Sequence, residues 1–256
     1  MSMKEDGDVL KRFRESFSNV NGHFHVLEQK VPLEKQMDYF RNSERFRRNN
    51  PNFAVSFDDA YAQECNLKLQ EPTTTIEEMK RVLTEMAVSK NIKAFRILEE
   101  YAKNPRQDVA DWTYMALMEC RISLESDFSD EKQIYISTGL GGKGEKLRFY
   151  IFLLSREKEP FLEYQRQIIE REFTYALSKA DCEIERLTIG EQYVELLFLI
   201  SVRTDLKLII DSIINECNQY GNFLSNTFTV TNVKEFSEEE IQNMIDKKDG
   251  DSKTGD

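Results

Sequence analysis

The sequence predicts an α+β protein in which a helical N-terminal region is followed by a layered region of strands and helices. Before about residue 130, apolar residues recur every three to four positions, which is the period of amphipathic helices. After that point, short runs rich in β-branched and aromatic residues alternate with helical patterns. We therefore expect a helical region over residues 1–129, an α+β domain over 130–236, and a short helix with a disordered tail over 237–256.

Proline and asparagine divide the first part of the helical region. A short amphipathic helix is predicted over Val9–Phe17, and a second helix begins behind Pro32 and ends at Asn49–Asn52. The apolar face of the second helix is expected to comprise Leu33, Met37 and Phe40. A third helix begins behind Ser56 or Asp58 and ends at Glu71–Thr73.

Three further helices complete this region. Thr74 and Glu77 have the spacing of a capping box, which predicts the start of the fourth helix. The apolar stripes of the fourth and fifth helices comprise Ile76, Met79, Leu83 and Met86, and then Ile92, Phe95, Leu98 and Tyr101. The last helix, from about Asp108 to Leu124, is apolar almost all round, so we expect it at the centre of the helical core.

Part of this region resembles a HEAT repeat. Lys93–Tyr101 reads as an apolar helix, Asn104–Pro105 as a short turn, and Ala116–Leu117 as the small–large apolar pair of a second helix. The resemblance covers about one repeat over residues 90–124, to which residues 74–90 would add a neighbouring helix. As a whole the chain is similar to a bacterial family of HEAT-like proteins, and that resemblance implies no particular activity.

The second region contains one pattern twice. Arg148–Ser155 and Val194–Ser201 are continuous apolar runs that start 46 positions apart and end in serine. Each is followed by a linker, an amphipathic helix and a β-like segment, namely Cys182–Ile189 and Thr227–Phe236. Two tandem β-α-β units predict a ferredoxin-like sandwich, with the two apolar runs as its central strands. The second helix is expected to be capped by Thr204.

An additional strand is predicted at Lys132–Ser137, joined to the first central strand by a glycine-rich loop. A plain ferredoxin-like sheet already fills both sides of that central strand. The extra strand would therefore displace a neighbour, or the hairpin would project from the sheet. The sequence leaves both arrangements open.

Composition limits the class of protein. Apolar residues make up 40% and charged residues 32% of the chain, which is a soluble globular profile. The net charge of −11 does not favour a dedicated nucleic-acid binder, although a local basic patch can override the total. No apolar run approaches the ~20 residues that span a bilayer. The four cysteines are far apart, which is typical of reduced thiols in a cytoplasmic protein.

The glycine-rich stretch Ser137–Lys146 holds four of the ten glycines. It is not a phosphate-binding Walker loop, because Gly144 is followed by Glu145 and then by a strand rather than a helix. Two interpretations remain: a mobile hairpin tip, or a contact loop that meets an acidic partner or a nucleic-acid backbone. The candidate residues of the contact loop are Gly139, Gly141, Gly142, Lys143 and Lys146.

The two histidines, His23 and His25, flank one apolar residue. On a strand both side chains would point to one face, as in the metal site of HUH nucleases. The second region loosely resembles the small tyrosine transposases of that superfamily, but Tyr193 and Glu195 stand where their histidine pair lies. We therefore expect no metal site and no cofactor, and the histidines are interpreted as part of an exposed linker.

A basic helix segment is the other candidate site. Arg41, Arg45 and Arg48 would share one helix face. The aromatic residues interleaved with them are Tyr39, Phe40, Phe46 and Phe53. Arginine with aromatic residues suits RNA phosphates and unstacked bases, but the same pattern describes arginines that face water or pair with carboxylates.

No pattern of a nucleophile with its base appears in the sequence. The favoured interpretation is a non-enzymatic cytoplasmic interaction module that binds another protein and no membrane. The alternative is RNA or single-stranded DNA binding through the Arg41–Arg48 helix and the Gly139–Lys146 loop. A metal-dependent nuclease is the third hypothesis.

Overall fold

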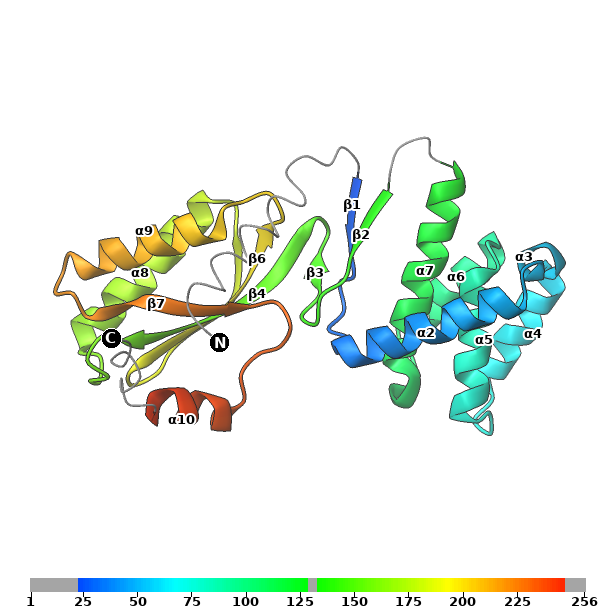
Figure 1. Cartoon of the computed structure of the whole chain (residues 1–256), viewed down its shortest axis with the longest axis horizontal. Helices are drawn as coiled ribbons and strands as arrows, with labels where there is room; N and C mark the ends of the chain where they lie inside the picture. Colours follow the sequence, from blue (N-terminus) through cyan, green and yellow to red (C-terminus); the bar gives the residue numbers. More distant parts are fainter. Residues whose placement is uncertain (1–22, 129–132, 247–256) are drawn as a thin grey trace, which may run out of the picture. The chain divides into compact units, whose positions relative to one another are not determined.

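A computed structural model describes residues 23–128 and 133–246, and the chain folds as two compact units that divide at Gly144 (Figure 1). We call residues 21–144 the helical unit and the part from residue 145 onwards the sandwich unit. The α+β class is confirmed. The helix predicted over Val9–Phe17 and the tail predicted after Lys247 lie outside the described residues.

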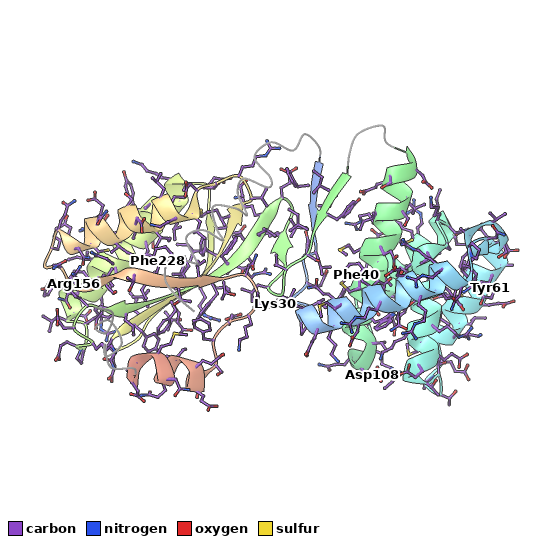
Figure 2. The ribbon with its side chains drawn as sticks, viewed as in Figure 1. Lys30, Phe40, Tyr61, Asp108, Arg156 and Phe228 are labelled. Carbon is purple, nitrogen blue, oxygen red and sulfur yellow. The ribbon has the colours of Figure 1, made fainter. Side chains whose placement is uncertain are left out.

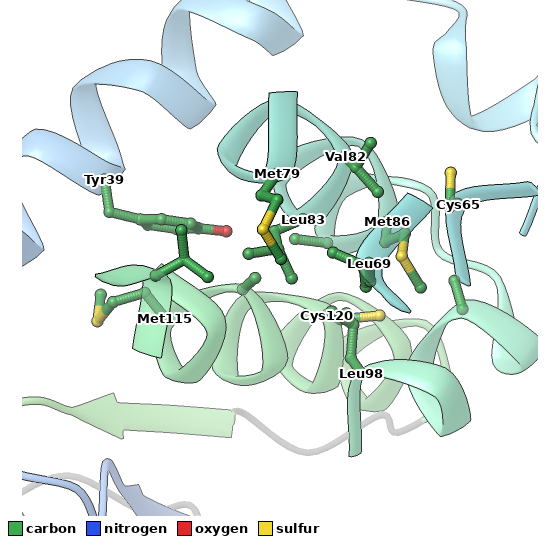
Figure 3. Close-up of a cluster of buried hydrophobic side chains, with 14 of the residues drawn as sticks. Tyr39, Cys65, Leu69, Met79, Val82, Leu83, Met86, Leu98, Met115 and Cys120 are labelled. Carbon is green, nitrogen blue, oxygen red and sulfur yellow. The ribbon is translucent and has the colours of Figure 1, made fainter. Parts of the chain in front are cut away.

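The helical unit is built around its last helix. Its helices are α2 (Leu33–Asn49), α3 (Phe53–Ser56), α4 (Asp59–Gln70), α5 (Ile76–Val88), α6 (Ile92–Tyr101), the 3-10 turn η1 (Gln107–Val109) and α7 (Ala110–Phe128). Helices α2, α5 and α6 all pack against α7, as its apolar circumference predicts. Met115 and Cys120 of α7 belong to the same buried cluster as Met79 and Leu83 of α5 (Figure 3).

Side-chain caps fix where these helices begin. Asp58 accepts from the Tyr61 N–H, so it is the cap of α4. Thr75, not Thr74, caps α5, because its hydroxyl accepts from the backbone N–H of Glu78. The Thr74 hydroxyl instead donates to the Lys68 carbonyl at 2.8 Å, which ties the turn to the end of α4.

Helix α2 faces the opposite way from the prediction. Leu33, Met37 and Phe40 are 40%, 52% and 43% exposed. The residues of α2 that are buried are Gln36, Tyr39 and Ser43. This inversion follows from a buried carboxylate on α7, described below, which requires hydrogen-bond donors rather than apolar side chains.

The extra strand predicted at Lys132–Ser137 pairs outside the sandwich. Strand β2 (Gln133–Ile136) lies parallel to β1 (His23–Val26) in a separate two-stranded sheet of the helical unit. The Leu27 N–H extends this pairing by donating to the Ile136 carbonyl at 2.9 Å. The strand therefore displaces no neighbour of the central strand and lies outside the sandwich sheet, as in the second arrangement considered from the sequence. Its partner was not predicted, because the linker around His25 supplies a strand of its own.

The sandwich unit has the predicted ferredoxin-like order. Its elements are β4 (Lys146–Ser155), α8 (Glu163–Lys179), β5 (Glu183–Ile189), β6 (Tyr193–Ser201), α9 (Leu206–Asn218), β7 (Leu224–Thr231) and α10 (Glu238–Asp246). The long strands are ordered β7-β4-β6-β5 and all pair antiparallel. The two apolar runs are its central strands, and Phe149 lies opposite Phe198. Figure 1 shows α8 and α9 on one side of this sheet and α10 on the other.

Two boundaries of the sandwich unit differ from the prediction. Asp205, not Thr204, caps α9, because its carboxylate accepts from the Leu208 N–H at 3.2 Å. Strand β7 ends at Thr231, and Phe236 lies beyond it, edge-on to the Tyr150 ring with the centroids 5.1 Å apart. The segment between β7 and α10 thus covers part of the sheet face that α8 and α9 leave open.

Candidate functional site

The buried side of α2 is held by Glu119 of α7, which is 6% exposed. Its carboxylate accepts from the Tyr39 hydroxyl at 2.5 Å and from the Ser43 hydroxyl at 2.6 Å, and it pairs with the Arg47 guanidinium. Burial, and then the charge of Glu119, raises the pKa of Tyr39 well above its ordinary value. The phenol therefore remains a donor, and α2 is fixed with its other side outward.

The outward side of α2 gathers the three arginines that the sequence singled out. Arg41 pairs with Asp38 at 3.4 Å and Arg48 with Glu44 at 2.7 Å, and both arginine side chains are more than 60% exposed. Arg45 makes no ion pair or hydrogen bond with any residue in the described part of the chain. Exposed pairs one turn apart contribute only about 0.3–0.5 kcal/mol, so all three guanidinium groups remain available to an external anion.

Apolar side chains adjoin this arginine strip. Met37 and Phe40 lie one turn from Arg41 and Glu44 on the same side of α2, and Figure 2 shows Phe40 on this helix. Among the predicted aromatics, Phe40 alone is exposed, because the Phe46 ring packs edge-on against Phe53 at 4.9 Å. Tyr39 is fully buried in the core. We call Met37, Phe40, Arg41, Arg45 and Arg48 the α2 face.

The glycine-rich loop is not a mobile tip. Residues 138–142 are buried, and the Gln36 side chain donates to the Thr138 carbonyl at 3.1 Å on the buried side of α2. Gly141 has a φ of +68°, and a Cβ there would lie 2.5 Å from the Gln29 carbonyl oxygen and 2.6 Å from that of Glu28. Close packing, rather than mobility, therefore explains the glycine at this position.

The candidate contact residues of this loop are not gathered on the α2 face. Gly139, Gly141 and Gly142 are buried, and Lys143 is exposed in the two-residue strand β3 (Gly142–Lys143). The Lys146 ammonium donates to the backbone carbonyl of Asp181 at 2.6 Å and forms an ion pair with the Asp181 carboxylate at 3.0 Å. The structure thus brings the three arginines together on one side of α2, whereas Gly139, Gly141 and Gly142 are buried and Lys146 pairs within the sandwich unit.

The His25 ring lies in a small polar cluster. It stacks on Tyr135 with centroids 4.5 Å apart, and its Nε2 is 3.3 Å from the Glu125 carboxylate. The Tyr135 hydroxyl donates to the same carboxylate, and burial and this bond raise the pKa of Tyr135. Within residues 23–128 and 133–246, no three histidine, cysteine or acidic side chains form a group that could hold a metal ion.

At the position of the transposase histidine pair, the structure shows ordinary packing. The Glu195 carboxylate accepts from the Tyr150 hydroxyl at 2.6 Å, and Tyr193 stacks on Phe152. Cys65, Cys120, Cys182 and Cys217 are all free thiols. No helix in the described ranges is both long and apolar enough to cross a membrane.

Sequence reasoning missed Glu119, which orients the α2 face. The spacing of Gln36, Tyr39 and Ser43 could have indicated the buried side of α2. These residues follow one another at intervals of three and four positions, which is the spacing of a buried helix stripe. Such a polar stripe beside an apolar one indicates a helix with two candidate buried sides. The choice between them depends on a residue that lies 80 positions from Tyr39 in the sequence.

Comparison with known proteins yields only distant structural similarity. No protein-family model and no curated protein matches the sequence, so the HEAT-like resemblance stays a prediction. One similar structure is that of a "putative transposase" from Deinococcus radiodurans R1, with 15% identity over 39% of this chain and 88% of that one, at a TM-score of 0.35. Another is a REP-associated tyrosine transposase bound to a REP hairpin, with 11% identity over 46% of this chain and 68% of that one, at a TM-score of 0.32.

These neighbours correct one expectation. Both are described as transposases, which are enzymes, so the expectation that this chain is not an enzyme is contradicted and is not retained. At such TM-scores the similarity assigns neither a reaction nor a site to this chain.

Proposed function

We propose that the α2 face binds single-stranded nucleic acid, either RNA or DNA. The observation that carries this proposal is the exposure of Arg41, Arg45 and Arg48 on one side of a rigidly held helix, with the exposed Phe40 ring at the edge of that side. Guanidinium groups bind phosphates, and an exposed aromatic ring provides a surface on which an unpaired base stacks. A duplex offers no unstacked base to Phe40, so single strands are the favoured ligand.

The local charge supports this proposal against the acidic total. Residues 41–50 contain four arginines and one glutamate, which gives a net charge of +3 within a chain of −11. Arg47 is directed to the buried Glu119, so the outward positive charge comes from the other three arginines. Phosphates can replace Asp38 and Glu44 as partners at little cost, because those pairs are exposed.

The test is binding of a fluorescent single-stranded RNA and a DNA of the same sequence, measured by anisotropy at low and at moderate salt. We expect affinity to fall steeply with salt, with a slope of about 0.7 for each phosphate contacted. Replacing all three arginines by glutamine removes binding. Phe40→Leu keeps an apolar side chain but removes the ring, and it weakens binding by about 1–3 kcal/mol.

The matched control neutralises three cations of the same unit away from the α2 face: Lys35, Lys90 and Lys103. This variant loses the same charge and is expected to bind as the unaltered chain does, because none of these side chains lies among the three arginines. Equal loss in both triple variants would mean general charge attraction rather than a site. Salt-insensitive or absent binding contradicts the proposal and leaves the protein-interaction module, which stays a prediction.

A further inference from the structure

A cavity of about 410 Å³ opens between α4 and α6 in the helical unit. Asn66 and Gln70 line it from α4, and Lys93 and Arg96 line it from α6. The cavity is half open to solvent, and its volume lies in the range of small-molecule sites. None of the residues of the α2 face lines it.

The described lining of the cavity has a net positive charge, because Lys93 and Arg96 outnumber Glu100. Lys93 and Arg96 are one turn apart on α6, and neither forms an ion pair or hydrogen bond with any residue that the structure describes. Glu100 also lines the cavity, and its carboxylate forms an exposed pair with Lys103 at 2.5 Å, so the lining holds two cations and one anion. Like charges at this spacing repel, so an anion held between them would stabilise this part of α6.

The amide groups add further donors. Gln70 Nε2 donates to Asn66 Oδ1 at 3.2 Å, which leaves the Asn66 NH₂ available to a ligand. The Asn104 side chain makes no hydrogen bond with a residue of the described ranges. Two cations and two amides together offer many donors, which complements the acceptor-only oxygens of a carboxylate or a phosphate.

One part of the lining is apolar. Ile97 and Tyr101 line the cavity and are half-buried. The Tyr101 hydroxyl accepts from the Arg106 N–H at 3.3 Å, which fixes the direction of the ring. A ligand that combines an oxyanion with a planar apolar body therefore matches both parts of the lining.

We propose that this cavity binds a small organic anion, with its phosphate or carboxylate at Lys93 and Arg96 and its planar body against Ile97 and Tyr101. The proposal goes beyond nucleic-acid binding and does not depend on it. The ligand would carry an oxyanion on a flat apolar group. The experiment distinguishes whether that oxyanion is a phosphate or a carboxylate.

The experiment titrates phenyl phosphate, benzoate and inorganic phosphate separately into the ¹⁵N-labelled full chain, followed by amide NMR shifts. At least one organic anion should bind saturably, with the largest shifts on α4 and α6. Tighter binding of phenyl phosphate identifies a phosphate site, and tighter binding of benzoate identifies a carboxylate site. Inorganic phosphate should bind more weakly than either, because it has no apolar body.

Variants locate the binding. Lys93→Met together with Arg96→Gln should lower the affinity for the tighter-binding organic anion by at least about tenfold. This is the loss expected when hydrogen bonds to a charged group are removed. Lys93→Glu places a carboxylate one turn from Arg96, so it should abolish binding while the chain stays folded. Tyr101→Leu should lower the affinity for the organic anions and leave the affinity for inorganic phosphate unchanged.

Arg45→Gln is the matched control, since Arg45 also lacks a described partner but lies on the α2 face. It should leave anion binding unchanged while it weakens nucleic-acid binding, so the two proposals can fail separately. Absence of saturable binding at millimolar concentration overturns the inference. Unchanged affinity in the Lys93 and Arg96 variants, with a normal spectrum, overturns it as well.

Discussion

The two units differ in what their cores contain. Ten polar or charged residues are buried in the described part of the chain, and nine of them belong to the helical unit. The sandwich unit contributes Ser155, and its central strands bury almost continuous apolar runs. The comparison teaches that an apolar core can be inferred from local patterns, whereas a core built partly on carboxylates cannot.

The helical unit uses the same arrangement twice. Glu119 accepts from the Tyr39 hydroxyl, and Glu85, which is 4% exposed, accepts from the Tyr61 hydroxyl at 3.0 Å and from Arg81 at 3.1 Å. Burial, and then the charge of Glu85, raises the pKa of Tyr61 to about 12. Each carboxylate thus has a phenol and an arginine as partners, which offset the cost of its burial.

The largest effect is expected in the apolar core of the sandwich unit. Phe198 is fully buried at the centre of β6, so Phe198→Ala should destabilise that unit by about 3–5 kcal/mol. Hydrogen exchange followed by mass spectrometry would show faster exchange across β4, β6 and the two covering helices. Phe228→Ala is the control, because this ring is half-buried on the edge strand β7 and its loss should cost much less. Similar costs for the two variants would contradict an apolar core centred on Phe198.

A somewhat smaller effect is expected from the buried carboxylate of the helical unit. Glu119→Ala leaves the Tyr39 and Ser43 hydroxyls buried without their acceptor, which should cost about 3 kcal/mol. Trp112, the only tryptophan, lies edge-on to the Tyr39 ring at 5.1 Å, so its fluorescence during urea unfolding reports on this region. Glu44→Ala removes an exposed carboxylate from α2 and should change stability by less than about 0.5 kcal/mol.

A triple variant sharpens the same comparison. Glu119→Leu with Tyr39→Phe and Ser43→Ala replaces the three buried members of the network by apolar side chains, while Arg47, whose side chain is 54% exposed, turns to water. Replacing a whole buried network is often neutral or stabilising, although removing one member is costly. Stability near that of the original chain is therefore expected. A loss as large as that of Glu119→Ala would mean that the network itself stabilises the unit.

The same contrast explains how much the sequence could predict. The ferredoxin-like order follows from two apolar runs at a fixed spacing, because strands that are buried on both faces read as continuous apolar runs and take the centre of the sheet. The outward direction of α2 depends on Glu119, which no local pattern connects to Tyr39. Likewise, the pairing of β1 with β2 joins His25 to Tyr135 across more than a hundred positions.

The candidate site was predicted in part for a similar reason. The spacing of Arg41, Arg45 and Arg48 alone places them on one helix side, and the structure agrees. Which aromatic residue accompanies them depends on tertiary packing: Phe46 turns to Phe53, and Phe40 stays exposed. The burial of the glycine-rich loop also depends on distant backbone, since the carbonyls of Glu28 and Gln29 lie against Gly141.

The smallest destabilising difference is expected between two glycines of that loop. Gly141 and Gly144 both have positive φ, +68° and +59°, so alanine at either position should cost about 1–2 kcal/mol from backbone conformation alone. A Cβ on Gly144 would meet no atom within 4 Å, whereas one on Gly141 would collide with backbone carbonyls that cannot rotate away. Gly141→Ala should therefore cost at least about 1 kcal/mol more than Gly144→Ala, as measured by urea unfolding followed at Trp112. Equal costs would mean that the loop yields easily, as a mobile tip would, and that its burial against the segment before α2 contributes little to the helical unit.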